Sequence, residues 1–181
     1  MASVHEDPRP YCELNVLEAE PLSETNCVND EDEEFFHEPF EVALDSGSGE
    51  HVVDEGDVPA YKVSESMGSR AGQHFVAANN SRIPNRGQVT LNLRGDTPPG
   101  QKGREIRSTF QVAKVSRPLW SVGRICDEGF DVKFTKHAAL IMNGDGRVVC
   151  RFERRGGLYI AKMSLGNPLF KMGFQRQGPK A

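Results

Sequence analysis

The sequence lacks the features that mark metal-binding, secreted and membrane proteins. Its four cysteines lie far apart, no two of them are spaced as Cys-x-x-Cys, and no histidine stands at a zinc-knuckle distance, which argues against a structural zinc site. The N-terminus is acidic and proline-bearing, without the apolar segment of a secretory signal. No run approaches the roughly 20 apolar residues of a membrane helix. We therefore expect an intracellular, cytoplasmic protein with reduced thiols, no metal, no cofactor and no membrane contact.

Basic residues are almost missing from the first third of the chain. Residues 1–60 hold 18 acidic residues and one arginine, whereas residues 61–181 hold eight acidic and 21 basic residues. So acidic a segment is usually solvated, and the mean hydropathy of −0.53 also predicts that part of the chain is disordered. Alternatively, the acidic segment folds back over the basic half as an electrostatic cover. The bases of that half are scattered, so we expect no nucleic-acid partner.

From Glu41 onward the pattern is that of β-structure, with short apolar runs separated by Gly, Pro and Asn. One short helix is expected between Val122 and Gly129. A Gly- and Pro-rich loop is expected over residues 94–107, and residues 14–17 allow at most a transient helical turn. The expected strands are residues 42–44, 52–53, 73–77, 88–93, 108–113, 119–122, 130–134, 139–142, 148–152 and 158–161.

The first of these strands runs directly into Asp45-Ser46-Gly47. A strand holds an aspartate rigidly, a neighbouring hydroxyl can bond to backbone, and a glycine lets two such loops approach closely. Aspartic proteases place their catalytic carboxylate in this context, although the tripeptide alone is more often an ordinary turn. No serine-type site competes with this interpretation, because the five histidines are scattered and none forms a motif with Asp and Ser.

A β-hairpin is expected about thirty residues after Asp45. Its tip would be Asn79-Asn80, since asparagine tolerates positive φ. The hairpin has two interpretations: an ordinary surface hairpin, or the flap that closes over the substrate of an aspartic protease.

Together, the apolar strand, Asp45-Ser46-Gly47, the hairpin and Val122-Gly123-Arg124 resemble the retropepsins, the dimeric aspartic proteases of retroviruses and LTR retrotransposons. Residues 118–134 (PLWSVGRICDEGFDVKF) and 154–159 (RRGGLY) are similar to the segment of copia-type polyproteins that joins protease to integrase. His51 also fits the copia pattern, although a structural role in the core is the favoured explanation for it. The resemblance covers roughly residues 41–163.

The resemblance implies a mainly β protein built on one lobe of a retropepsin-like acid-protease β-barrel, with one short helix. The implied divisions are a disordered acidic tail over residues 1–37, the protease domain over 38–130, a β-hairpin extension similar to the copia connector over 131–165, and a disordered tail over 166–181.

It also implies an endopeptidase that processes its polyprotein as a homodimer, each copy supplying one Asp45. Ser46 would bond across the dimer, and Gly47 would let the two loops touch. Gly123 and Arg124 would support the site from beneath. The residues implied to cover the substrate are Ala78, Asn79, Asn80, Ser81 and Arg82.

One departure from the family keeps a second hypothesis open. Copia-type proteases usually have alanine after Asp-Ser-Gly, whereas this chain has Ser48, whose hydroxyl would add a hydrogen bond near the catalytic carboxylate. No Gag zinc knuckle or integrase zinc module flanks the domain. The alternative is therefore a catalytically silent binding or dimerisation module from a degenerate transposon copy.

Overall fold

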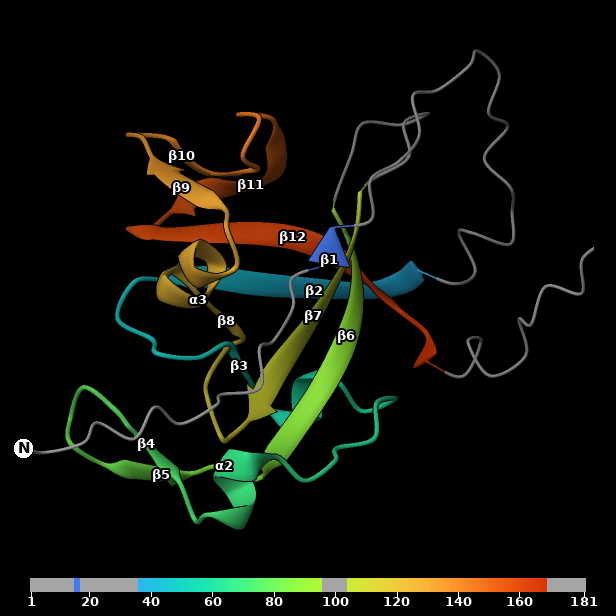
Figure 1. The fold of residues 1–181 in the computed structure, drawn as a ribbon, viewed down its shortest axis with the longest axis vertical. Coiled ribbons are helices and arrows are strands. Elements are labelled where there is room, and N and C mark those ends of the chain that lie inside the picture. The colour runs from blue at the N-terminus through green and yellow to red at the C-terminus, as the bar shows by residue number, and fades with distance from the viewer. Residues whose placement is uncertain (1–14, 17–35, 96–103, 169–181) are drawn as a thin grey trace, which may run out of the picture.

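The computed structural model describes residues 15–16, 36–95 and 104–168 (Figure 1). The acidic tail and the C-terminal tail expected from the sequence lie for the most part outside these residues. The described part is mainly β, as expected. No helix within it is long and apolar enough to cross a membrane.

Ten strands join in one mixed sheet, and two more form a separate hairpin. The sheet contains β1 (Asn15–Val16), β2 (Phe36–Asp45), β3 (Val52–Val53), β6 (Gly87–Gly95), β7 (Glu105–Val112), β8 (Leu119–Ser121), β9 (Asp131–Phe134), β10 (Ala138–Met142), β11 (Val148–Arg155) and β12 (Leu158–Gly166). The hairpin consists of β4 (His74–Val76) and β5 (Arg82–Pro84). The helical turns are η1 (Glu55–Asp57), α2 (Met67–Arg70) and α3 (Val122–Asp127).

Six strands of the sheet follow one another around a ring. β2 pairs with β12, β12 with β6, and β6 with β7. β7 pairs in parallel with β3. One residue pair, Val52 with Leu119, joins β3 to β8. β8 pairs in parallel with β2, which closes the ring. β11, β10 and β9 extend outward from β12, and β1 adds to β7. The ring fixes the end of β2, which carries Asp45, between two other strands.

The inside of the ring is filled by large apolar side chains. Along β6 the residues alternate between buried and half-buried, as the period of two in the sequence predicts. Trp120 of β8 is fully buried, with ring centroids 6.3 Å from Phe110 and 5.9 Å from Phe152. Burying an aromatic side chain of this size stabilises the fold by roughly 3 kcal/mol, so β8 is held firmly beside β2.

Several local expectations were wrong. Asn15 and Val16 form a strand rather than a helical turn, because their backbone pairs with β7. The structure has a second short helix, α2, which begins at a capping box between Ser66 and Ser69; a box closed by two serines, over only four helical residues, gives almost no sequence signal. The loop expected over 94–107 is shorter, because β6 continues to Gly95 and β7 starts at Glu105.

The region expected to be a β-hairpin extension contains four strands, β9 to β12. The last of them, β12, pairs with β2 from Phe36 to Ala43 and with β6 from Leu93 to Gly95. β12 is therefore part of the ring itself.

Candidate active site

Asp45 is the last residue of β2, where the strand leaves the sheet. It stands opposite Ser121 in the parallel pairing with β8. The three preceding residues, Val42, Ala43 and Leu44, are buried, so the strand is covered on both faces and held in place. The Asp45 side chain is half-buried, and its Oδ1 accepts a hydrogen bond of 2.8 Å from the Gly47 N–H. The carboxylate is thus oriented by its own loop and remains accessible.

Ser121 joins the Asp45 loop to the helix that follows β8. Its Oγ donates to the Ser48 carbonyl at 2.6 Å and accepts from the Arg124 N–H at 3.2 Å as the N-cap of α3. One buried hydroxyl therefore fixes the start of α3 and the end of the Asp45-Ser46-Gly47-Ser48 turn at the same time.

His51 supports the same serine from below. It is 1% exposed and packs beside Phe110 and Trp120. Its Nδ1 accepts the Ser121 backbone N–H at 3.0 Å. Because Nδ1 accepts, it carries no proton, and Nε2 is the protonated nitrogen of the neutral ring. Nε2 lies 3.8 Å from Oε1 of the largely buried Glu128, the C-cap residue of α3, and makes no hydrogen bond within the described residues.

Glu50 and Arg124 form a second connection between the Asp45 loop and α3. The Arg124 Nε lies 3.1 Å from Glu50 Oε2, and both side chains are partly buried. Gly123 precedes Arg124 in the first turn of α3; a Cβ there would meet only Ser121 Oγ, at 3.8 Å. The structure thus brings Asp45, Ser48 and Arg124 together around Ser121; their role in supporting a catalytic site stays a prediction.

The small residues of the turn differ in their surroundings. Ser46 and Gly47 are exposed, and a Cβ on Gly47 would lie 3.3 Å from Asp45 Oδ1, so a glycine keeps the carboxylate uncrowded. Ser48 makes the additional hydrogen bond expected of its hydroxyl, but its Oγ donates to the Glu50 carbonyl at 2.6 Å and not to the Asp45 carboxylate. The nearest acceptor is the backbone two residues ahead, as in an ordinary serine turn.

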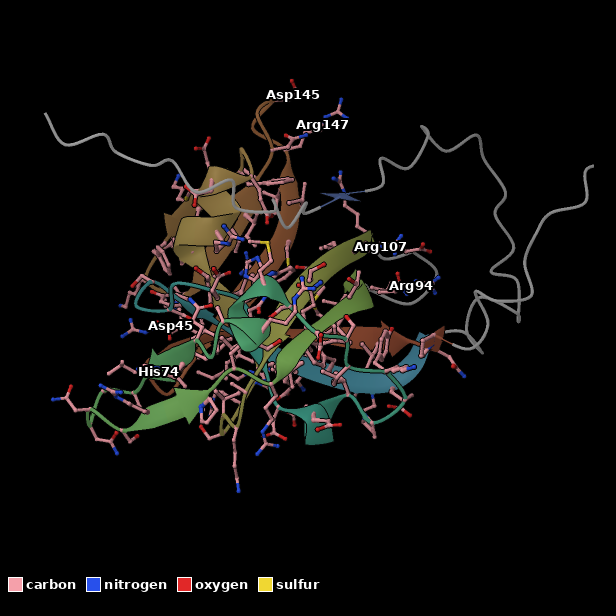
Figure 2. The ribbon with its side chains drawn as sticks, turned by 60° about the horizontal axis from the view of Figure 1, so that its bottom comes forward. Asp45, His74, Arg94, Arg107, Asp145 and Arg147 are labelled. Atoms are coloured by element: carbon pink, nitrogen blue, oxygen red, sulfur yellow. The ribbon has the colours of Figure 1, made fainter. Side chains whose placement is uncertain are left out.

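The hairpin β4–β5 lies on the same side of the molecule as the turn after Asp45 in both views (Figures 1 and 2), and Figure 1 shows it well below the end of β2. At its tip, Asn79 Oδ1 accepts from the Ser81 N–H at 3.0 Å and from the Ser81 hydroxyl at 2.7 Å, and Asn80 has φ of 64°. In the described residues no hydrogen bond or ion pair joins Ala78, Asn79, Asn80, Ser81 or Arg82 to the Asp45 loop.

Sequence reasoning missed the contacts of His51 and Glu128. Ser121 and Glu128 follow His51 by 70 and 77 positions in the chain, and only the folding of the ring brings them close to it. Residues 15–16, 36–95 and 104–168 contain no cluster of three or more His, Cys, Asp or Glu that could hold a metal ion. Two pockets of about 320 and 330 Å³ open elsewhere on the molecule and are not lined by Asp45.

Comparisons of the chain with models of protein families, with curated proteins and with solved structures found no match.

Proposed function

We propose that the protein is an aspartic endopeptidase of the retropepsin type, related to the proteases of copia-type retrotransposons and active as a homodimer on peptide bonds. The observation that carries the proposal is the setting of Asp45. An accessible carboxylate stands at the end of a covered strand, opposite Ser121 of a parallel strand that leads into α3, and its loop is fixed to that helix by Ser121 and Arg124.

The chemistry needs two carboxylates about 3 Å apart that share one proton. One takes a proton from the attacking water, while the other, protonated, donates a hydrogen bond to the scissile carbonyl. The two titrations belong to the pair and not to either residue. This chain supplies one such aspartate, so a twofold axis beside Asp45 would complete the site.

The exposed residues around Asp45 fit this arrangement. Ser46 is free to bond across the axis, and Gly47 permits close approach of the two loops. The hairpin β4–β5 would cover the substrate and exclude water. Its tip is held in a defined turn by Asn79 and Asn80, and Val76 exposes 62% of its surface, which would suit contact with an apolar substrate side chain or with a second hairpin.

The test compares the full chain with its Asp45→Asn variant. Cleavage of a mixed peptide library is followed between pH 4 and 7, with and without pepstatin, and the association state is measured by analytical ultracentrifugation. We expect cleavage by a dimeric parent, its inhibition by pepstatin, and a loss of at least about a thousandfold in the variant, because both aspartates of the pair become amides.

Asp145→Asn is the matched control, because Asp145 lies in the β10–β11 turn, far from Asp45 in Figure 2. This variant should cleave the peptide library as the parent does. A folded parent dimer without cleavage would leave the silent dimerisation module as the function, and Ser48→Ala would then test whether that hydroxyl prevents turnover. Cleavage that survives Asp45→Asn would refute the assignment.

A further inference from the structure

A pocket of about 330 Å³ lies between the paired ends of β6 and β7 and the strands β11 and β12. Three cationic side chains line it: Arg104, Arg151 and Lys162. None of the three makes a side-chain hydrogen bond or ion pair within the described residues. Glu153 is the acidic residue of the lining, and it is already paired with Arg155 Nη2 at 3.6 Å. With three cations against one carboxylate, the lining of the pocket carries an excess of positive charge.

Cys150, at the wall of the pocket, does not offset that charge. Burial raises the pKa of its thiol to about 12, so the sulfur is neutral at ordinary pH. Arginine guanidinium groups bind carboxylates in a fork of two hydrogen bonds, and a lysine adds a mobile point charge. Two arginines and one lysine around an open space are suited to a ligand that carries several carboxylates.

The chain itself contains such a ligand. Residues 17–35 hold eight acidic residues and no basic one, including the run Asp30-Glu31-Asp32-Glu33-Glu34. The structure describes the residues on either side of this segment. β1 and β7 are antiparallel: Asn15 pairs with Arg107, and Val16 pairs with Ile106. From Asn15 to Val16, β1 therefore runs toward the Arg104 end of β7. Phe36 pairs with Gly166 of β12, the strand that carries Lys162.

We propose that this pocket binds the carboxylates of an acidic peptide, and that residues 17–35 of the same chain are its occupant. Fourteen residues beyond Val16 can span up to about 46 Å, so the acidic run reaches the pocket without strain. Tethering at both ends gives an effective concentration in the millimolar range, at which weak ion pairs are populated. The pocket lies away from the candidate active site: in Figure 2, Arg94 and Arg147, next to the lining residues Gly95 and Val148, are far from Asp45. The proposal is thus independent of the proteolytic function.

Zero-length coupling of the full chain with a carbodiimide tests whether residues 17–35 occupy the pocket. This reagent joins a carboxylate to a lysine amine only when the two groups are in contact. Peptide mapping by mass spectrometry would quantify amides between residues 17–35 and each lysine. We expect Lys162 to couple at least threefold more than the exposed Lys133 of β9. Mixing ¹⁵N-labelled and unlabelled chains separates coupling within a chain from coupling between chains.

Two variants sharpen the measurement. Arg104→Ala with Arg151→Ala should reduce coupling at Lys162 at least threefold, whereas Arg70→Ala with Arg117→Ala, two exposed arginines outside the pocket, should leave it unchanged. Amide replacements of the five acids at 30–34 should abolish the preference for Lys162, and 0.5 M NaCl should weaken it in the parent.

Equal coupling at Lys162 and Lys133 in the parent would overturn the proposal. Coupling at Lys162 only between differently labelled chains would assign the pocket to a second copy. Binding of a single-stranded oligonucleotide that depends on Arg151, without preferential coupling at Lys162, would assign it to nucleic acid. Coupling only between chains would reject residues 17–35 of the same chain as the occupant, and the oligonucleotide result would reject an acidic peptide of either origin.

Discussion

At the scale of single residues, Ser121 is the side chain on which the candidate site depends most. Its backbone N–H is bound by His51, and its hydroxyl bridges the Ser48 carbonyl and the Arg124 N–H. Two segments of the chain, residues 48–51 and 121–124, are therefore joined at one fully buried serine. The position of Asp45 relative to α3 is set by these backbone contacts and by the Arg124–Glu50 ion pair.

Ser121→Ala removes the N-cap of α3 and leaves the Ser48 carbonyl without its donor. We expect a loss of about 2 kcal/mol in the free energy of unfolding, measured by urea denaturation. Ser116→Ala, at an exposed serine four residues after Val112, should stay within about 0.5 kcal/mol of the parent. Equal stability of the two variants would mean that the hydroxyl bridge contributes nothing.

At the scale of elements, the start of β6 requires a glycine. Gly87 has φ of +141°, and a Cβ there would lie 2.3 Å from the Ser64 carbonyl oxygen and 2.9 Å from Val63 Cγ1. The segment containing Ser64 crosses β6 at this point and forms a β-bridge with Gln88. The close crossing holds the connection between η1 and α2 against the ring.

Gly87→Ala should therefore lower the free energy of unfolding by about 3 kcal/mol or more, because both backbone strain and the clash with Ser64 oppose it. Thermal unfolding followed by circular dichroism would measure the change. Gly144→Ala is the control, since a Cβ at Gly144 meets nothing within 4 Å. If the two variants unfold at the same temperature, the crossing at Ser64 is looser than described.

The sequence predicted those elements whose signals are local. Alternation identified β6, the Asn143–Gly146 turn closes through the Arg147 N–H bonded to Asn143 Oδ1 at 2.9 Å, and Asn80 adopts the positive φ expected of a hairpin tip. The ring could not be predicted, because the pairing of β2 with β12 joins residues more than a hundred positions apart and has no signature within either strand. For the same reason Asp45 could be nominated from its tripeptide, whereas the role of Ser121 and His51 could not.

At the scale of the whole molecule, stability should depend on alkaline pH through Cys150. Burial raises the pKa of its thiol from 9.0 to about 12, so the folded state keeps a proton that the unfolded state gives up above pH 9. The stabilisation is fully present below pH 9 and is lost progressively as the pH rises toward 12.

Between pH 8 and 10 we expect this thiol to cost about 1.4 kcal/mol of stability, seen as a lower urea midpoint. Cys150→Ala should show a smaller decrease over the same interval, and Cys126→Ala, at an exposed thiol, should behave as the parent does. A parent whose midpoint shifts no more than that of Cys150→Ala would contradict the linkage.

The place of β12 in the ring also determines when the molecule can be completed during synthesis. β2 is translated before both of its sheet neighbours, β8 at residues 119–121 and β12 at residues 158–166. Pairings this distant in sequence form slowly. A nascent chain that has reached Asp45, and even α3, still lacks the strand that holds β2 on its other side. The aspartate is therefore translated well before the two strands that fix β2 in position.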